Sequence, residues 1–419
     1  MDRERARADA AASAVTTRPS PAVEPTSGRE GGPVVDRRTL LGRGGLLLAG
    51  LALAGCAPGA GSLTATRPRR RLAPVRAAWD RIIRTTVGLR PYRPSGFVVR
   101  AEKLDDRLLV HDYGHGGAGM SLSWGTAALA ADLAVARPER SAAVIGCGVA
   151  GLTAARELQR RGFDVTIYAM SVPPDTTSNM SLASWTPSSG LVDDERRTPA
   201  WDAQMRRAAE ISYTRLQLLV GRGYGVSWLE RYALRDSRPT PSAAPEREEE
   251  EPLVPRHLST GARLLEPGEH PFPTPYASAR TQIRIEPSIY LDALVRDVLD
   301  FGGRIVIRRF RDRRDLATLE EPVIVNCTGL GSRGLFGDLE LTPVKGQLTV
   351  LAPQPEVDYG TFGALVDSRA GGVGFHMQPR ADGIVLGGTS QEGEWRLEPD
   401  EEARRSIVEA HIELFSAMG

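Results

Sequence analysis

The hydrophobic pattern of the chain is most regular between residues 141 and 169. The short apolar run Ala142–Ile145 predicts a buried strand. After it, apolar side chains recur at helical spacing, opposite a face of arginine and glutamine: Leu152, Ala155 and Leu158. Gly162 ends this helix, and Phe163–Tyr168 predicts a second, parallel strand. The pattern therefore predicts a strand–helix–strand unit.

Gly146, Gly148 and Gly151 stand between the first strand and the helix at the spacing G-x-G-x-x-G. The first makes a tight turn, the second lets a pyrophosphate approach the backbone, and the third lets the helix pack on the strand. Inside a strand–helix–strand unit this spacing favours dinucleotide binding over a purely structural turn. The acid expected after the second strand is absent from Tyr168-Ala169-Met170-Ser171, so no residue is assigned to the ribose.

The remainder of the chain mixes both periods, which predicts an α/β protein, α+β overall. Helices are predicted at Ala73–Arg84, Trp124–Ala134, Trp201–Val220, Tyr290–Phe301 and Glu401–Phe415. Strands are predicted at Leu108–Tyr113, Ile283–Pro287, Arg304–Arg309 and Pro322–Asn326. Thr86–Pro94 is predicted to be extended because prolines follow both of its arginines, and an extended backbone can aim a guanidinium. The acidic run Glu246–Glu251 is interpreted as a solvated loop, not a metal site.

Composition narrows the class of protein. The chain has 419 residues and a formal net charge of +1, which suits a two-domain enzyme and gives no reason to expect nucleic-acid binding. Its three cysteines, Cys56, Cys147 and Cys327, do not make a disulfide framework. Cys147 lies in the glycine turn and Cys327 follows an apolar strand, so both are expected to be buried thiols.

The N-terminal segment is interpreted as a targeting signal. Residues 1–36 lack any apolar period and are predicted to be disordered. Residues 37–56 join the pair Arg37-Arg38 to the apolar run Gly44–Gly55, which is too short for a membrane-spanning helix. This arrangement resembles a twin-arginine export signal, and Leu53-Ala54-Gly55-Cys56 resembles a lipobox, although Arg37-Arg38 alone could be a chance pair. We expect export to the cell envelope, a lipid anchor at Cys56 as the only membrane contact, and a flexible linker at 57–72.

Two motifs precede the glycine turn: Gly88-Leu89-Arg90-Pro91-Tyr92-Arg93-Pro94 and His111-Asp112-Tyr113-Gly114-His115-Gly116-Gly117-Ala118-Gly119. They resemble G-[FL]-R-P-x-R-P and H-N-Y-G-H-G-G-x-G of the D-amino acid oxidase family, and Asn326-Cys327-Thr328-Gly329 resembles its N-C-T-G. In that family the first two motifs lie near the C-terminus, after the dinucleotide turn. The resemblance, which covers residues 73–419, therefore implies a circular permutation, with the new ends in a helical region between Ile412 and Ala73.

The resemblance implies a Rossmann-like FAD-binding domain and a substrate domain on a mixed or antiparallel sheet, both discontinuous in sequence. The expected FAD-binding domain takes about 101–215 and 285–343, and the substrate domain about 73–100, 216–284 and 344–419. FAD is the implied cofactor and no metal is expected. A small-molecule D-amino acid and O₂ are the implied partners, and a homodimer is compatible with the resemblance.

The residues that would hold FAD follow by position from the family motifs. They are Gly146, Gly148, Val149, Ala150 and Gly151; Thr176, Thr177 and Ser178 for the pyrophosphate; Ala183 and Ser184 for the isoalloxazine; Phe310 for the adenine; Thr328 and Gly329; and Gly116, Gly117, Ala118, Gly119, Met120 and Ser121. For residues 176–178 the alternative is an ordinary Ser/Thr loop. His115 is interpreted as a hydrogen-bonded structural residue, not a base.

Substrate binding is assigned to three positions. Arg90 is expected to clamp the substrate carboxylate, because a guanidinium binds a carboxylate through two parallel hydrogen bonds. By carry-over, the Gly117 carbonyl would receive the amine. His376 stands where the family has a tyrosine that helps to bind the carboxylate, which leaves the specificity open.

The resemblance implies hydride transfer from the substrate Cα to flavin N5 without a side-chain base, followed by re-oxidation by O₂ to hydrogen peroxide. The imino acid would hydrolyse to a 2-oxo acid and ammonia. Two alternatives remain at this point: a glycine- or sarcosine-type or other amine oxidase or dehydrogenase of the same superfamily, and a lipid-anchored flavin-binding protein without catalysis.

Overall fold

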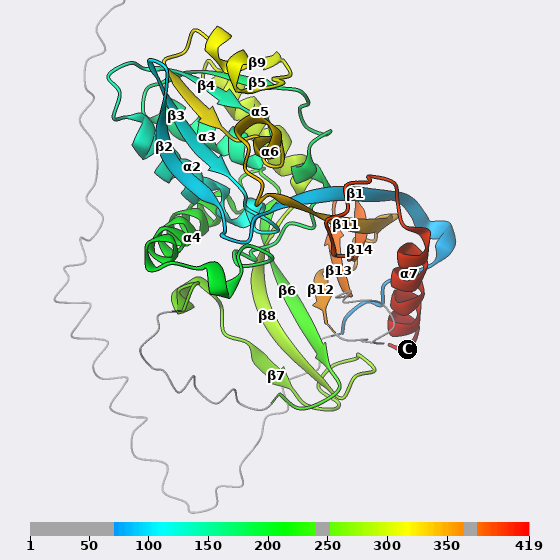
Figure 1. Ribbon diagram of the computed structural model, residues 1–419. Helices are drawn as coiled ribbons and strands as arrows, with labels where there is room; N and C mark the ends of the chain where they lie inside the picture. Colours follow the sequence, from blue (N-terminus) through cyan, green and yellow to red (C-terminus); the bar gives the residue numbers. More distant parts are fainter. Residues whose placement is uncertain (1–70, 240–251, 364–374, 419) are drawn as a thin grey trace, which may run out of the picture. The chain divides into compact units, whose positions relative to one another are not determined.

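A computed structural model describes residues 71–239, 252–363 and 375–418. The predicted targeting signal with Cys56, most of the linker and the acidic run Glu246–Glu251 lie outside these ranges. Within them the chain forms two β-sheets with helices packed on them (Figure 1). None of the helices in these ranges is long and apolar enough to cross a membrane.

In the described part of the chain, one sheet has six strands. Their order is β2 (Val98–Leu104), β3 (Arg107–Tyr113), β10 (Val323–Asn326), β4 (Ser141–Ile145), β5 (Asp164–Ala169) and β9 (Arg304–Ile307). All neighbours pair in parallel except β2, which is antiparallel to β3. Because parallel strands end at the same edge of a sheet, the segments that follow β3, β10 and β4 converge there. These segments carry the motifs of residues 111–119, 326–329 and 146–151.

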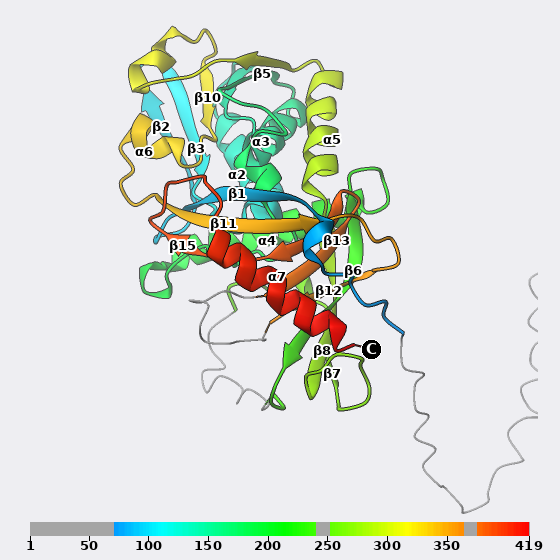
Figure 2. The same ribbon diagram turned by 90° about the vertical axis from the view of Figure 1, so that its right-hand side faces the viewer.

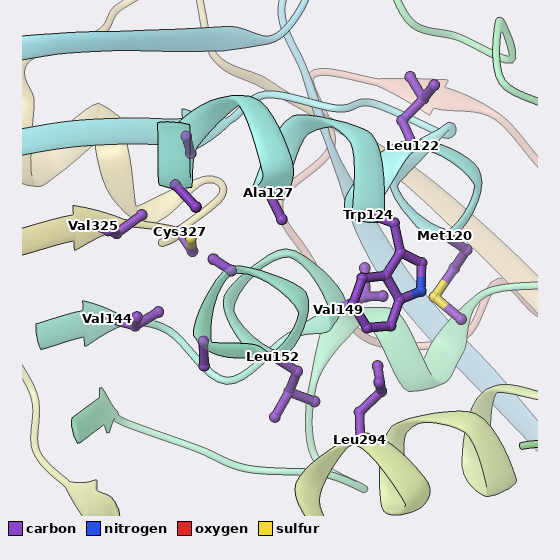
Figure 3. Packing of buried hydrophobic residues seen from close by; sticks show 14 of the residues in the cluster. Met120, Leu122, Trp124, Ala127, Val144, Val149, Leu152, Leu294, Val325 and Cys327 are labelled. Atoms are coloured by element: carbon purple, nitrogen blue, oxygen red, sulfur yellow. The ribbon is translucent and has the colours of Figure 1, made fainter. Parts of the chain in front are cut away.

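Helices cover one face of this sheet. α2 (Gly119–Ala134), α3 (Val149–Arg160) and α5 (Pro287–Asp300) contact its strands, and α4 (Pro199–Leu219) packs on α2. Figure 3 shows Trp124 of α2, Leu152 of α3 and Leu294 of α5 converging in the core. The other face packs on η5 (Arg313–Thr318) and α6 (Gly331–Phe336). Short helical turns elsewhere are η1 (Trp79–Arg81), η2 (Thr177–Met180), η3 (Asp194–Arg196) and η4 (Arg256–Leu258).

The other sheet has nine strands within the described residues. Along its main path they are β1 (Ile82–Tyr92), β11 (Thr342–Leu351), β14 (Gly383–Gly387), β13 (His376–Arg380), β12 (Tyr359–Phe362), β6 (Val226–Arg235), β8 (Tyr276–Ile285) and β7 (Arg263–Leu265), and β15 (Gln391–Glu392) pairs with β11. The pairing is antiparallel except between β12 and β6, so the sheet is mixed.

The register of the mixed sheet separates its two faces. Thr86, Leu348, Gly387, His376 and Phe362 lie opposite one another in a row across five strands, so they share one face, which we call the site face. The alternate positions point the other way and form a second core with α7 (Glu401–Ser416), which crosses the sheet in Figure 2. The site face is therefore the one turned away from α7.

Several predicted element boundaries are wrong. Ala73–Arg84 is not a helix: residues 71–78 have no regular structure, η1 follows, and Ile82 begins β1. The helical spacing was fortuitous, because the β-branched residues from Ile82 onwards pair with β11 along the whole strand. Of the region predicted to hold the permuted ends, only the α7 side is helical. The strand predicted at Ile283–Pro287 begins at Tyr276, and Pro287 opens α5.

Further boundaries differ by a few residues. The helix predicted from Trp124 begins at Gly119, the helix predicted from Tyr290 begins at Pro287, the helix predicted from Trp201 begins at Pro199, and the strand predicted to reach Arg309 ends at Ile307. The fold class itself is confirmed as a mixed α/β protein, with a largely parallel Rossmann-like sheet and a mixed sheet.

Candidate active site

The glycine turn after β4 depends on two close backbone approaches. Gly146 has φ +115°, and a Cβ there would lie 2.5 Å from the carbonyl oxygen of Cys327. A Cβ on Gly151 would lie 2.0 Å from the carbonyl oxygen of Gly146, so α3 packs directly on the turn. The first and third glycines thus do what the sequence predicted for them.

The N-terminus of α3 is suited to an anion. The helix begins at Val149 without an acid in its first turn and without a capping side chain at Gly148. Instead, the Val149 N–H donates to Oγ of Ser178, 3.0 Å away on η2. A Cβ on Gly148 would lie 3.1 Å from the same Oγ. The predicted pyrophosphate residues 148, 149 and 178 therefore converge at one point in front of the helix.

The neighbouring hydroxyls are only partly directed to this point. The buried Thr176 donates to Oδ1 of Asn179 at 2.8 Å, whereas Thr177 is exposed. Thr328 donates to Oδ1 of Asn326 at 2.7 Å, and the Asn326 amide lies 3.0 Å from Nδ1 of His111. This last contact ties the turn after β10 to β3.

Residues 182–186 cross between the two sheets and are held from both sides. Oγ of Ser121, in the first turn of α2, donates to the Ser184 carbonyl at 2.9 Å. On the other side, the amide of Gln378 donates to the carbonyls of Leu182 and Ala183 at 3.0 and 3.2 Å. Ala183 adopts φ +58°, a conformation that non-glycine residues rarely take. The segment predicted to meet the isoalloxazine is thus fixed by a buried network.

The glycine-rich loop between β3 and α2 joins this region. The Gly116 N–H donates to the carbonyl of Pro91 at 2.9 Å, which joins the two motifs that precede the glycine turn. The Gly117 N–H donates to the carbonyl of Gly190 at 3.2 Å. His115 is buried, with Nε2 at 2.9 Å from Oγ1 of Thr126, as expected for a structural histidine.

The remaining predicted cofactor residues occupy three places. Ala118 and Met120 are buried at the start of α2, where the helix has no capping side chain and no acid. Gly329 has φ +55° and faces the ring of Pro91. A Cβ on Gly329 would lie 3.8 Å from ring atoms of Pro91. Phe310 is nearly buried, with its ring beside Tyr168 and below the guanidinium of Arg308.

Arg90 reaches the site face from β1. It is on the same face as Thr86, four residues earlier on the strand, and its guanidinium lies over Gly346. Nη1 donates to the Thr389 carbonyl at 3.3 Å, and among the described residues no carboxylate lies within 4.0 Å of the group. Burial alone lowers its pKa. Arg90 is therefore a partly buried cation without a counter-ion in the described residues.

Arg93, three residues later, is engaged elsewhere. Its Nε lies 3.0 Å from Oδ2 of Asp338, and its Nη1 lies 3.3 Å from Oε2 of Glu340. The hydroxyl of Tyr113 donates to the same Asp338 oxygen at 2.8 Å. Of the two arginines in the Gly88–Pro94 motif, Arg90 is thus the one available to an anionic ligand.

His376 lies on the site face at the start of β13. Its ring covers two glycines of β14 and the turn after it: a Cβ on Gly387 would lie 2.3 Å from its Nε2, and one on Gly388 would lie 2.6 Å from its Cε1. Its ring also stacks on that of Phe362, with centroids 6.4 Å apart. His376 and Arg90 therefore lie on the same face of the mixed sheet.

Gln378 holds the segment 182–184 in place and was not predicted from the sequence. It is fully buried, and Oγ of Ser184 donates to its Oε1 at 2.6 Å. Its position two residues after His376 on a strand, which places both side chains on one face, was the available signal. Thr389, whose carbonyl accepts from Arg90, gave no such signal because its backbone makes the contact.

The two described cysteines are free and buried, as predicted. Burial raises the pKa of the Cys147 thiol to about 12, and it also raises the pKa of Cys327. Neither thiol is therefore a thiolate near neutral pH. Among the described residues, no group of three His, Cys, Asp or Glu side chains is placed to hold a metal ion.

Comparison with known families decides how this site is classified. A family profile described as FAD dependent oxidoreductase, DAO, matches residues 141–419. The chain belongs to the DAO family of FAD-dependent oxidoreductases. FAD is accordingly the cofactor of this DAO-family protein. The profile begins at β4, so it does not include β1, β2, β3 and α2.

Curated relatives agree with the family. A D-amino-acid oxidase of Rubrobacter xylanophilus is 32% identical over 278 residues, which are 64% of this chain and 74% of the relative. The human D-aspartate oxidase is 29% identical over 270 residues, 64% of this chain and 73% of the relative. Among solved structures, glycine oxidase from Geobacillus kaustophilus aligns with a TM-score of 0.48 and 17% identity, over 67% of this chain and 80% of that one.

Proposed function

We propose that this DAO-family protein oxidises a D-amino acid to the 2-oxo acid, ammonia and hydrogen peroxide. The observation that carries the proposal is Arg90: a cation on the site face with no counter-ion among the described residues, its guanidinium over Gly346 and bonded to the Thr389 carbonyl. The D-amino-acid oxidase and D-aspartate oxidase relatives support the same substrate class.

The residues present fit FAD. The start of α3 with Gly148 and Ser178 would hold the pyrophosphate, and residues 183–184 with the start of α2 would meet the isoalloxazine. Bound FAD supplies the acceptor for the Cα hydride and passes the electrons on to O₂. Gly116–Ser121 would complete the cradle, and Phe310 would lie toward the adenine.

The protein's own contribution is orientation. The Arg90 guanidinium would hold the substrate carboxylate in two parallel charge-assisted hydrogen bonds, which fixes the position of Cα. The Gly117 carbonyl would accept a hydrogen bond from the substrate amine. His376 would replace a tyrosine hydroxyl as the second group near the carboxylate. If the substrate enters with a neutral amine, the reaction needs no side chain to act as a base.

We also propose that the chain is circularly permuted relative to its family. Residues 71–140, outside the family match, supply β1 to the mixed sheet and β2, β3 and α2 to the other. Leu72 and Val75 pack in the same core as Leu414 and Phe415, so the two ends of the described chain meet. A rearranged chain that begins at Ser141 and carries residues 71–136 after Met418 should fold and bind FAD. An insoluble or FAD-free product would contradict the permutation.

The function is tested by a substrate screen. The purified protein, loaded with FAD, is assayed for peroxide with D- and L-amino acids, glycine and sarcosine. We expect peroxide from D-amino acids and none from their L-enantiomers. Peroxide from glycine or sarcosine alone would establish the glycine-type alternative, and reduction of an artificial acceptor without use of O₂ would indicate a dehydrogenase. Absence of any turnover would favour the non-catalytic flavoprotein.

Gly346→Ala tests whether activity depends on the position of the Arg90 guanidinium over Gly346. A Cβ at this position would lie 2.6 Å from Nη2 and 2.8 Å from Cζ of Arg90, closer than atoms can pack, so the guanidinium must move. We expect the variant to fold and bind FAD, while kcat/KM falls by about 10- to 100-fold, as for a clamp misplaced by about 1 Å. Gly334→Ala, where a Cβ meets nothing within 4 Å, is the control. Equal activity of both variants would show that Arg90 does not bind the substrate.

Export and lipid anchoring remain proposals from the N-terminal sequence. In a host with the twin-arginine pathway, Arg37→Lys combined with Arg38→Lys should leave the protein in the cytoplasm, because the pathway requires the arginine pair. Cys56→Ala should release the exported protein from the membrane fraction. Cell fractionation and immunoblotting measure both, and unchanged export of the double lysine variant would show that the signal is of another kind.

A further inference from the structure

Arg231, on β6, is a second arginine on the site face and is buried more deeply than Arg90. The residue is only 8% exposed, and burial lowers its pKa to about 10, which keeps it charged at neutral pH. Within the described residues no carboxylate lies within 4.0 Å of it. A buried charge without a counter-ion is costly, so its presence in a folded protein requires a reason.

The hydrogen bonds of Arg231 leave one edge of its guanidinium unoccupied within the described part of the chain. Nη1 donates to Oε1 of Gln282 at 3.1 Å, whereas Nε and Nη2 are buried without an acceptor. The N–H groups of Nε and Nη2 point in the same direction, and together they form the edge that binds a carboxylate through two parallel hydrogen bonds. The geometry thus matches a carboxylate and not a single carbonyl.

Arg231 is connected to the candidate active site along the sheet. Gly360 lies opposite Arg231, and Phe362, two residues on, lies opposite His376, so the three side chains share the site face. The Phe362 ring stacks on His376 with centroids 6.4 Å apart, and the Arg231 Cζ lies 5.6 Å from the same ring. Phe362 is 51% exposed, so the line from His376 to Arg231 runs along an accessible apolar surface.

A second connection runs through Gln282. Its Oε1 accepts from Arg231, and its Nε2 donates to the carbonyl of Trp185, which directly follows Ser184. Arg231 is therefore two hydrogen bonds from the segment proposed to meet the isoalloxazine.

We propose that Arg231 binds a second carboxylate, at the end of the substrate side chain, and that the site therefore selects acidic D-amino acids. The assignment deepens the proposed function and rests on it. Arg90 holds the α-carboxylate, Phe362 covers the methylene groups, and Arg231 holds the distal carboxylate. D-Aspartate and D-glutamate both carry a side-chain carboxylate, and they differ in its distance from the α-carboxylate.

Kinetics on matched substrates test the assignment. D-Glutamate is compared with D-glutamine, and D-aspartate with D-asparagine, because each amide keeps the shape and removes the charge. We expect the wild type to prefer at least one acid over its amide by about tenfold or more, and Arg231→Gln to lower kcat/KM for that acid by about 30- to 1000-fold. The amides should change by less than about threefold, and Arg231→Lys should recover part of the loss. An equal loss on acids and amides, or a wild type that prefers amides, would overturn the proposal.

A binding assay separates failure of this assignment from failure of the proposed function. The FAD-loaded protein is titrated with succinate, glutarate and butyrate, and the flavin absorbance spectrum is followed. We expect a dicarboxylate to bind about tenfold or more tightly than butyrate, and Arg231→Gln to abolish the difference with unchanged FAD content and butyrate affinity. Equal affinity of the wild type for all three acids would contradict the assignment of Arg231. Tighter dicarboxylate binding without peroxide from any D-amino acid would leave Arg231 assigned and refute the oxidase function.

Discussion

Arg90→Ala is expected to abolish useful oxidation of D-amino acids while FAD stays bound. The guanidinium is a partly buried cation that donates to a backbone carbonyl, so its removal breaks no ion pair among the described residues. It does remove the proposed partner of the substrate carboxylate, and deleting one member of such a charge pair costs about 2–5 kcal/mol. Steady-state kinetics on the best D-amino acid should show kcat/KM lowered about 30- to several thousand-fold.

Arg93→Ala is the matched control, since it removes the same side chain from the same motif. Arg93 is paired with Asp338 and Glu340, so we expect its loss to lower thermal stability but to leave kcat/KM within about threefold of wild type. If Arg90→Ala also stays within about threefold, both the carboxylate role and the match of the Gly88–Pro94 motif at this position must be abandoned.

Gly148→Asp is expected to yield a folded protein that binds FAD much more weakly. An aspartate at this position suits the helix itself, because its carboxylate lies at the positive N-terminus of α3. The same carboxylate would occupy the place proposed for the pyrophosphate and repel it. We expect FAD affinity, measured by flavin fluorescence on titration of the apoprotein, to fall on the order of 100-fold, which corresponds to about 3 kcal/mol.

Gly148→Ala separates the charge from the added volume. Its Cβ would meet only Oγ of Ser178, at 3.1 Å, and a serine rotamer can relieve this contact. FAD affinity should therefore change by less than about tenfold. If the alanine and aspartate variants lose FAD equally, close packing and not the anion site explains the glycine. If both retain FAD, the pyrophosphate lies elsewhere.

The dinucleotide unit could be predicted from sequence because its signals are local. The strand at 142–145, the glycine turn and the amphipathic helix each follow from residues within one window, and the structure has them within a few residues. The prediction at 73–84 failed for the complementary reason. Its apolar residues fit a helical period, but pairing with β11, which is far away in sequence, determines their conformation.

The choice between Arg90 and Arg93 illustrates a second limit. Both arginines precede a proline in an extended segment, so the local sequence treats them alike. Only Asp338 and Glu340, more than two hundred residues later, show that Arg93 has an ionic partner. Arg231 and Gln378 were not predicted, because the sequence does not show which face of the sheet a single polar residue in a strand lies on. Only the register of the paired strands shows that both lie on the site face.

The placement of residues 71–140 in both sheets has a consequence for biosynthesis. These residues are synthesised well before their partners, because β3 must await β10 and β1 must await β11, both of which lie much later in the chain. Until then β1 lacks its neighbour in the sheet, and β3, although paired with β2, lacks its second neighbour, and such edges invite aggregation. Native contacts of such long sequence separation also form slowly. Folding of this chain is thus expected to be post-translational and to benefit from a chaperone that shields the nascent N-terminal strands.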